Sequence, residues 1–486
     1  MITTRNHAYA ELEKPMEGPR PLCVDLNGTL VKNDTLADSL LLLVRTHPSQ
    51  ALKVPLWLME GKAALKEKVT SMVSLDAAHL PYNKSLLLYL REQRELGREI
   101  FLTTGADRGI AVPIADHLGI FTDVLASDGS TNFTGKAKLA GLKHRFGPVF
   151  DYVGNTGRDL SVLANASEPM LANPNGPLSA RLRTREIAIS RTFEDRKPWL
   201  KAVVKAVRPH QWAKNVLVFL PLLLAHTLRL RAIAEVTLAF VCFCLSASAS
   251  YVLNDLLDIE ADRLHPKKRL RPFAAGDLGA GVGLGIALLF VAAAFIGAHF
   301  LPVSFLDCLL IYTAATLLYS FYLKKKVLVD VIVLSALYTL RLLAGGAAAH
   351  VKISPWLAAF SVFLFLSLAM VKRFSELQNS RTQGFTSPSR GYLLIDIEQL
   401  RSFGTASGYA AVVVFSLYIS SQDVVVLYPH AVRMWLIVPL MIFWISRVWL
   451  LAGRGELNED AVTFALTDRL SLLTGFCVAM VALVAM

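Results

Sequence analysis

The sequence contains little charge and few cysteines for its length. Of its 486 residues only 18% are Asp, Glu, Lys or Arg, whereas soluble domains average about 25%. Its five cysteines are scattered, and no CxxC pair or histidine-rich tract accompanies them. These shortages exclude a disordered chain, a purely soluble enzyme, a disulfide framework and a zinc-binding module.

Apolar and basic residues are plentiful instead. Apolar side chains make up 54% of the sequence, and the formal net charge is +12. An excess of positive charge favours nucleic acid, anionic lipid or phosphorylated substrates as partners. The long apolar stretches favour the last two, so we expect a membrane partner and no nucleic acid.

The chain divides into two halves of different character. Apolar runs are short up to about residue 200, and long apolar stretches follow from about residue 212. A bilayer core needs ~20 apolar residues per helix. We predict nine membrane spans, at 212–228, 233–253, 280–300, 303–323, 327–348, 354–371, 404–420, 434–452 and 470–486.

The placement of Lys and Arg predicts the orientation of these spans. With the N-terminus inside, the cytosolic loops carry fifteen of these residues and the opposite loops four. Cytosolic loops are normally the basic ones. The first 20 residues are polar and lack the apolar core of a signal peptide. We therefore expect a multi-pass protein of the inner (plasma) membrane with a cytosolic N-terminal domain.

Three carboxylates stand at the end of the second predicted span. Asp255, Asp258 and Asp262 are spaced three and four residues apart, which puts them on one face of a helix. Such carboxylates repel one another unless a cation lies between them. Mg²⁺ prefers a few carboxylates, waters and substrate phosphates. The pattern predicts a Mg²⁺–diphosphate site, and the alternative is a solvated acidic helix end.

A basic segment, HPKKRLRP (265–272), follows directly. Its two prolines break helix, so the cations are expected on a loop above the carboxylates. Lys268 and Arg271 could hold phosphate oxygens there. The alternative is an ordinary excess of positive charge on the cytosolic side.

The acidic motif, NDxxDxxxD (254–262), resembles the first motif of the UbiA superfamily of intramembrane prenyltransferases. Five further segments are similar to one branch, the decaprenyl-phosphate phosphoribosyltransferases: RPHQWAKN (208–215), DRxHPxKRxRP (262–272), YS with KKK (319–326), KRFxEL (372–377) and DRLSL (468–472). The resemblance implies an all-α, nine-helix integral membrane fold. It also implies 5-phosphoribosyl 1-diphosphate as donor and a polyprenyl phosphate as acceptor.

The resemblance assigns roles to particular residues. Asp255 and Asp258 become catalytic and, with Asp262, hold Mg²⁺ as cofactor. The expected substrate-binding residues are Asn254, Lys214, Arg208, Lys268, Arg271, Lys324, Asp330, Lys372 and Arg373. Prenyltransferases that act on aromatic rings usually carry a second motif with two or more Asp, whereas only Asp330 stands at that place. Prenyl transfer from a diphosphate therefore remains the alternative, and a homo-oligomer is left open.

The N-terminal half shows apolar strands that end in polar groups. Asp25 and Asn27 follow one strand, Thr104 another, and Asn155 with Asp159 a third. Helical patterns at 107–118 and 136–146 alternate with these strands. The alternation predicts a doubly wound parallel sheet with the polar groups at the carboxyl ends of the strands.

This half resembles the haloacid dehalogenase (HAD) superfamily over about 20–175. The resemblance implies an α/β HAD-like (Rossmannoid) domain with a helical cap at about 31–95. Asp25 matches the nucleophile and a metal ligand, Thr104 and Lys138 the phosphate-binding residues, and Asp159 a metal ligand; Lys136 competes with Lys138.

Two departures from the HAD pattern matter. Asn27 replaces the general acid–base Asp, and Asn155 replaces an Asp that helps to hold Mg²⁺. An amide cannot titrate and is a weaker ligand than a carboxylate. We expect a degenerate, phosphatase-like domain. The competing hypothesis is a phosphatase that removes the 5-phosphate from the lipid product.

These observations predict the organisation of the domains. The expected parts are a polar tail (1–20), a HAD-like domain (20–185), a basic juxtamembrane linker (186–208) and a UbiA-type transmembrane domain (209–486).

Overall fold

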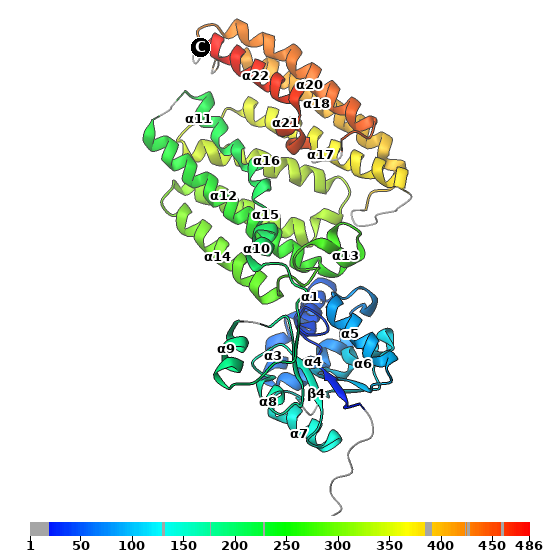
Figure 1. Ribbon diagram of the computed structural model, residues 1–486. Helices are drawn as coiled ribbons and strands as arrows, with labels where there is room; N and C mark the ends of the chain where they lie inside the picture. Colours follow the sequence, from blue (N-terminus) through cyan, green and yellow to red (C-terminus); the bar gives the residue numbers. More distant parts are fainter. Residues whose placement is uncertain are drawn as a thin grey trace, which may run out of the picture. The chain divides into compact units, whose positions relative to one another are not determined.

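The computed structural model describes residues 19–128, 132–174, 176–226, 229–383, 391–422, 424, 428–457 and 461–486. It divides into two compact units (Figure 1). The first unit contains the residues up to Ala206 and the segment Val252–Gly285. The second unit contains Val207–Tyr251 and Ile286–Met486. The segment with the acidic motif therefore packs with the N-terminal residues.

A six-stranded sheet forms the centre of the first unit. Its strands are β1 (Leu22–Val24), β2 (Ile100–Asp107), β3 (Asp123–Ser127), β4 (Asp151–Gly154), β5 (Pro169–Ala172) and β6 (Arg191–Phe193). The order is β3-β2-β1-β4-β5-β6, and every pairing is parallel. The order reverses between β1 and β4, and open α/β sheets bind ligands at the carboxyl ends of strands beside such a point.

Helices cover the sheet and form an inserted segment between β1 and β2. The inserted helices are α1 (Thr35–Thr46), α2 (Pro48–Ala51), α3 (Val54–Met59), α4 (Lys62–Met72) and α5 (Lys84–Glu95). Later helices are α6 (Arg108–Leu118), α7 (Lys136–Phe146), α8 (Leu160–Leu163), α9 (Gly176–Thr184) and α10 (Trp199–Val207). The predicted doubly wound α/β architecture and the helical character of 31–95 are confirmed.

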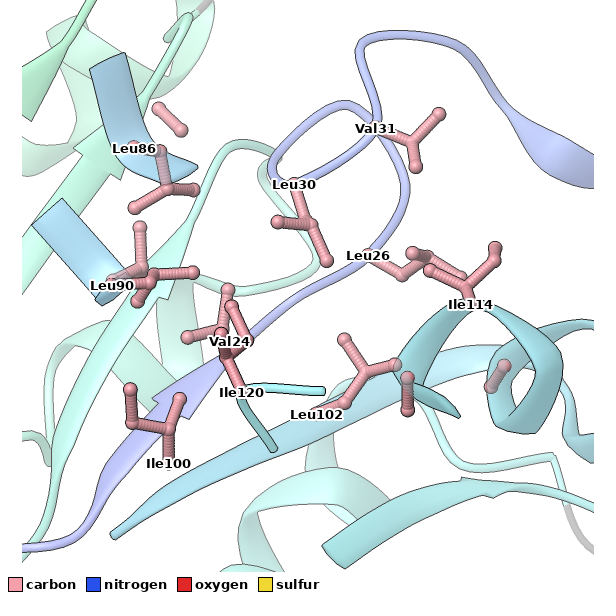
Figure 2. Close-up of a cluster of buried hydrophobic side chains, with 14 of the residues drawn as sticks. Val24, Leu26, Leu30, Val31, Leu86, Leu90, Ile100, Leu102, Ile114 and Ile120 are labelled. Carbon is pink, nitrogen blue, oxygen red and sulfur yellow. The ribbon is translucent and has the colours of Figure 1, made fainter. Parts of the chain in front are cut away.

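An apolar core fixes the central strands. Figure 2 shows Val24 of β1 and Ile100 and Leu102 of β2 with Leu86 and Leu90, which α5 supplies. All five side chains have no exposed surface. Full burial of such a side chain contributes about 1.5–3 kcal/mol. This packing fixes the position of β1 and therefore of the start of the loop that carries Asp25.

Side-chain caps set where the helices of this unit begin. The carboxylate of Asp34 accepts from the amides of Leu36 and Ala37 at the start of α1. Asn83 caps α5 and Asp107 caps α6 in the same way. A cap of this kind is worth roughly 1 kcal/mol. The cap at Asp34 positions α1 directly after the loop that carries Asp25.

The second unit contains most of the long apolar helices. Within the described residues, seven helical segments are long and apolar enough to cross a membrane: Leu230–Leu257, Ala280–Ala298, Val303–Phe321, Val329–Ala348, Pro355–Arg381, Leu394–Ile419 and Ala431–Gly453. The α-helices in them are α12 (Leu230–Leu257), α14 (Ala280–Ala298), α15 (Val303–Phe321), α16 (Val329–Ala348), α17 (Pro355–Gln383), α18 (Ile397–Ile419) and α20 (Ile437–Gly453). Within the unit α15, α16, α17 and α18 each pack against the next (Figure 1). The chain is an integral membrane protein.

The predicted count of nine spans is not confirmed. In place of one helix at 212–228, the described residues form a 3₁₀ helix (Pro209–Phe219) followed by the short α11 (Leu220–Leu224). Pro209 and Pro221 lack amide protons, which disfavours one continuous α-helix there. The last predicted span is α22 (Arg469–Ala485), which is apolar but shorter than the seven. The short α21 (Ala461–Thr467) precedes it.

The acidic motif does not lie on one uninterrupted helix. Helix α12 ends at Leu257, and α13 (Ile259–Leu264) begins after Asp258. Asp258 has φ −94° and ψ 10°, outside the helical region. The amide of Asp262 nevertheless donates to the carbonyl of Asp258 at 2.8 Å, so the helical path continues after a local kink. The direction of the Asp258 side chain therefore differs from that in a regular helix.

Candidate functional site

Two of the three predicted carboxylates converge on one cation. The Nη1 atom of Arg271 lies 3.1 Å from Oδ1 of Asp255 and 2.7 Å from Oδ2 of Asp262. Both carboxylates are nearly buried, with 1% and 4% of their side-chain surface exposed. Burial raises the pKa of Asp262 to about 6, and Arg271 opposes that rise. The predicted basic loop therefore does reach the predicted acids.

The third carboxylate has a different partner. Nη1 of Arg45, on α1, lies 3.3 Å from Oδ1 of Asp258 and donates to the carbonyl oxygen of Leu257 at 3.2 Å. Arg45 stands more than 200 residues before the motif. The N-terminal sequence thus supplies an arginine that pairs with a carboxylate of the acidic motif.

The donor set at Asp255 and Asp262 fits a divalent cation. One guanidinium nitrogen already lies within hydrogen-bond distance of both carboxylates, so the two side chains are aimed at a single cationic position. Mg²⁺ is commonly held by one or two carboxylates together with substrate phosphates. Among the described residues no three acidic, histidine or cysteine side chains gather as a metal-binding group. A bound ion would therefore need oxygen ligands from water or substrate as well.

A buried ion pair fastens the motif to the α/β part of the first unit. Nη2 of Arg263 lies 2.5 Å from Oδ2 of Asp38, and each side chain is 1% exposed. Nη1 of Arg263 also bonds to Glu260. The amide of Asn33 donates to Asp38 and, at 3.1 Å, to the carbonyl of Phe273. These contacts anchor both ends of the segment that carries Asp262 and Arg271.

The HAD-like residues also meet, in a cavity of the first unit. Nζ of Lys138, on α7, lies 2.7 Å from Oδ1 of Asp25 and 3.5 Å from Oδ1 of Asp159. It also donates to the Tyr152 hydroxyl at 3.0 Å. Lys138, and not the rival Lys136, therefore occupies this position.

Burial and mutual charge control these ionisable groups. Burial raises the pKa of Asp25 to about 6 against the opposing effect of Lys138. Burial alone would lower the pKa of Lys138, but Asp25 and Asp159 raise it above its usual value. Burial opposes ionisation of Asp159 too, yet Lys138 and the bonds from Thr156 hold the pKa of Asp159 below its usual value. The ammonium therefore stays charged between the two carboxylates.

The two asparagines that depart from the HAD pattern lie in the same cavity. Oδ1 of Asn27 accepts from the amide of Thr35 at 3.1 Å, so it serves the start of α1. Gly28 has φ +76°, and a Cβ at this position would collide with the side chain of Asn155. Thr104 also lines the cavity, and its hydroxyl accepts from the amide of Ala106.

The cavity does not fit the Mg²⁺ that the HAD resemblance implies. Two carboxylates remain, and the ammonium of Lys138 already lies between them. The first of the two asparagines is engaged with α1. A divalent cation would have to displace the Lys138 side chain, which is 3% exposed, whereas the Arg271 side chain at the acidic motif is 24% exposed. No chemical step is therefore assigned to a metal in this cavity.

In the second unit, two predicted substrate-binding residues bind each other. Nε of Arg373 on α17 lies 2.6 Å from Oδ2 of Asp330 on α16, and the Tyr392 hydroxyl donates to Oδ1 of Asp330 at 2.5 Å. Arg373 also contacts Glu376 and Tyr319. Asp330 is fully buried, and Arg373 is 2% exposed. The Arg373–Asp330 ion pair therefore links α17 to α16.

The remaining predicted residues of the second unit are half-buried. Lys214 lies on the 3₁₀ helix, Lys324 on the 3₁₀ turn Leu323–Lys325, and Lys372 on α17. The guanidinium of Arg208 lies 5.6 Å from the ring centroid of Tyr251. In the first unit Asn254 lies on α12 and Lys268 on the 3₁₀ turn Lys268–Leu270.

Sequence reasoning missed several polar residues that the structure places at these sites. Arg45 contacts the acidic motif, Asp38 pairs with Arg263 directly after it, and Asn33 and Thr35 line the N-terminal cavity. No local pattern marks these residues, because their partners lie far away in sequence.

Comparison with known proteins agrees with these features. The described part of the chain combines long apolar helices with an acidic motif, and the model of the UbiA prenyltransferase family matches residues 216–473. The match covers more than half of the chain, so the chain belongs to the UbiA prenyltransferase family. In the attached parallel-sheet domain, Lys138 lies between Asp25 and Asp159, which are residues that the sequence resemblance singles out.

Individual relatives are similar over one or both parts of the chain. The protein y4nM of Sinorhizobium fredii, described as uncharacterised, is 36% identical over 470 residues, 96% of this chain and 91% of the relative. A decaprenyl-phosphate phosphoribosyltransferase of Mycolicibacterium smegmatis is 35% identical over 232 residues, 47% of this chain and 73% of that protein. Among solved structures, a UbiA homologue from Archaeoglobus fulgidus bound to GPP and Mg²⁺ has a TM-score of 0.45 at 15% identity, covering 58% of this chain and 96% of that chain.

Proposed function

We propose that the chain is a Mg²⁺-dependent membrane transferase that moves 5-phosphoribose from 5-phosphoribosyl 1-diphosphate to a polyprenyl phosphate. The observation that carries the proposal is the convergence of Asp255 and Asp262 on one cationic position beside a basic loop. The 35% identity to a decaprenyl-phosphate phosphoribosyltransferase supports the choice of substrates.

The reaction needs charge stabilisation at the leaving group. The C1–O bond of the donor breaks, and diphosphate leaves with the electron pair. A phosphate oxygen of the lipid then forms the new bond to C1. Mg²⁺, held by Asp255 and Asp262 with Asp258 nearby in the motif, would neutralise the developing negative charge on diphosphate.

The arginine and lysine of the basic loop are proposed to bind the diphosphate of the donor. Arg271 now occupies the position between the two carboxylates, and its fork geometry also suits phosphate oxygens. We assign Arg271 and Lys268 to the diphosphate. Asn254, the first residue of the motif, lies on α12 and stays a candidate contact.

The acceptor is already an anion, so it needs positioning more than a base. Lys214, Arg208, Lys324 and Lys372 are the candidate phosphate-binding residues of the second unit. Arg373 and Asp330 keep only an indirect role, because each is buried against the other. A lone, arginine-bound Asp330 also offers little support for a second Mg²⁺, which is why prenyl transfer remains the weaker alternative.

The N-terminal HAD-like domain is proposed to be catalytically degenerate. Asp25 could still act as a nucleophile, but Asn27 cannot titrate and is bound to the amide of Thr35. We place this domain in the cytosol and the helices in the inner (plasma) membrane. The sequence boundaries of the domains (20–185 and 209–486) are part of the same proposal.

A product assay tests the transferase. The full chain in detergent is supplied with Mg²⁺, polyprenyl phosphate and radiolabelled 5-phosphoribosyl 1-diphosphate, and the lipid extract is separated by thin-layer chromatography. We expect a charged labelled lipid, loss of at least ~100-fold in rate for Asp255→Asn, and no loss for the matched control Asp116→Asn, an exposed acid on α6. Labelled lipid from a prenyl diphosphate and an aromatic acceptor, but none from the phosphoribosyl donor, would overturn the proposal.

A further inference from the structure

Helix α10 exposes a row of apolar side chains, although it lies outside the long membrane-type helices. Trp199, Leu200 and Val204 have 61%, 67% and 51% of their surface exposed. Ala202 and Ala206 of the same helix are buried. Residues four apart share one face of a helix, so α10 turns its alanines into the protein and presents Leu200 and Val204 to the outside. An apolar face that is exposed in this way indicates a partner.

Two lysines border this apolar face. Lys201 and Lys205 are four residues apart on α10, directly after Leu200 and Val204, and both are exposed. The long stem of a lysine lets its ammonium reach headgroups while neighbouring apolar side chains enter the lipid. An apolar helix face bordered by lysines is typical of a helix that lies in the surface of an anionic membrane.

The basic loop adds to the same surface. Nζ of Lys205 donates to the carbonyl oxygen of Leu270 at 2.8 Å, so α10 lies against this loop. Leu270, and Leu264 just before the loop, have more than half of their surface exposed. Lys267 and Arg269 of the loop are exposed as well. Exposed apolar and cationic side chains therefore alternate on two segments that are in contact.

The connectivity of the chain brings this surface to the membrane. Helix α12 ends at Leu257 and α14 begins at Ala280, and both helices are long and apolar enough to cross a bilayer. The segment that joins them contains the basic loop. A loop between two consecutive membrane-type helices lies where the chain leaves and re-enters the bilayer, at the depth of the headgroups.

Several cations of this surface are available to an external anion. The side chains of Lys201, Lys267 and Arg269 form no ion pair within the part of the chain that the structure describes. An anionic phospholipid offers both kinds of contact that the surface needs, because its headgroup carries a negative charge and its acyl chains are apolar.

We propose that α10 and the basic loop form an interfacial anchor that binds anionic phospholipids. In this anchor Leu200, Val204 and Leu270 enter the upper part of the acyl region, and the bordering lysines contact the headgroups. A lipid surface is favoured over a second protein because the loop joins two membrane-type helices. The anchor would hold the loop that carries Arg271 at a fixed depth, and it does not depend on the proposed transferase reaction.

Tryptophan fluorescence of the full chain in lipid nanodiscs tests the contact with the bilayer. The signal of Trp199 is the difference between wild type and Trp199→Phe. We expect lipids brominated high in their acyl chains to quench this signal about twofold or more, and iodide in the buffer to quench it little. Trp57→Phe gives the matched control, because Trp57 is buried on α3 and its signal should resist both quenchers.

The preference for anionic lipid is measured in nanodiscs of phosphatidylcholine and phosphatidylglycerol in equal amounts, with bromine on one lipid or the other. One lysine near an anionic surface contributes about a fivefold preference. We therefore expect brominated phosphatidylglycerol to quench Trp199 about twofold or more above brominated phosphatidylcholine, less so at high salt. The preference should disappear when Lys201→Gln and Lys205→Gln are combined. It should persist when Lys136→Gln and Lys143→Gln are combined, since these exposed lysines lie on α7.

Three results would overturn the proposal. Quenching of Trp199 by iodide and not by brominated lipid would show that α10 faces water. Protection from both quenchers would show that protein, such as a second copy of this chain, covers the helix. Equal quenching by the two brominated lipids would show that the anchor does not select anionic headgroups. None of these readouts uses catalysis, so failure of the transferase assay would leave them intact, and the reverse also holds.

Discussion

Arg45 and Asp258 form an ion pair across 3.3 Å, although more than 200 residues separate them in the chain. Arg45 also donates to the carbonyl of Leu257, the last residue of α12. One arginine from the inserted segment of the α/β domain thus contacts both the end of a membrane-type helix and a carboxylate of the acidic motif. The α/β domain is therefore part of the electrostatic environment of the proposed transferase site.

This contact predicts a change in metal dependence. A guanidinium beside a carboxylate competes with Mg²⁺ for its negative charge. We expect Arg45→Ala to lower the Mg²⁺ concentration for half-maximal transfer about threefold to tenfold at low salt, with a smaller effect at high salt because ions screen the interaction. Product formation is measured against Mg²⁺ concentration.

Two further variants serve as controls for the effect of Arg45→Ala. Arg45→Lys keeps the charge and should lie close to wild type. Arg145→Ala removes an exposed arginine that pairs with Asp123 and should leave the Mg²⁺ curve unchanged. An unchanged curve for Arg45→Ala would show that the contact is only structural.

The Asp38–Arg263 pair predicts a large loss of stability. Each side chain is 1% exposed, so Asp38→Ala leaves a buried guanidinium without its main partner. Breaking a buried pair in this way costs about 3–5 kcal/mol. We expect a clear fall in the thermal midpoint of the full chain, followed by differential scanning fluorimetry. Asp123→Ala, which breaks the exposed pair with Arg145, should change it little; equal effects of the two variants would contradict the prediction.

Parts of these sites could be predicted because they depend on local geometry. Spacings of three and four residues place Asp255 and Asp262 close enough to share Arg271. The groups after parallel strands meet at one edge of the sheet, which brings Asp25 and Asp159 to Lys138. Local rules of this kind need no knowledge of the tertiary structure.

Other parts depend on long-range packing or on small interruptions of a pattern. The helix is interrupted at Asp258, and this residue pairs with Arg45; regular spacing predicts neither. The predicted span at 212–228 followed apolar content and overlooked the effect of Pro221.

Cys23 gives a test of the packing of the sheet. It lies in β1 with no exposed surface, and burial raises the pKa of its thiol to about 12. The reactive thiolate is therefore almost absent at neutral pH. Mass spectrometry after brief treatment with iodoacetamide at pH 8 should find Cys23 unlabelled in the folded chain and labelled in denaturant. Rapid labelling without denaturant would show that the central strand opens readily.

The ion pair of Asp468 should make the stability of the last apolar helix depend on pH. Its carboxylate pairs with Arg447 through two bonds, of 2.6 and 3.0 Å, and accepts from the amide of Ser471 at the start of α22. The hydrogen bond from Arg447 is the main reason why the pKa of Asp468 falls to about 2. The pKa of an Asp in an unfolded chain is about 3.9. Because the folded pKa is the lower one, the stabilisation is complete above about pH 4 and is lost as the pH falls toward about 2.

Asp468→Asn should therefore lower the thermal midpoint at pH 7, and the difference from wild type should shrink steadily between about pH 4 and pH 2. The amide can still cap the helix but cannot pair with a guanidinium, so the pH-dependent part of the difference isolates the ion pair. Arg447→Gln removes the same pair from the other side and should show the same pH profile. In the double variant the two losses should not add, because both remove one interaction; additive losses would mean that the two residues stabilise the chain separately.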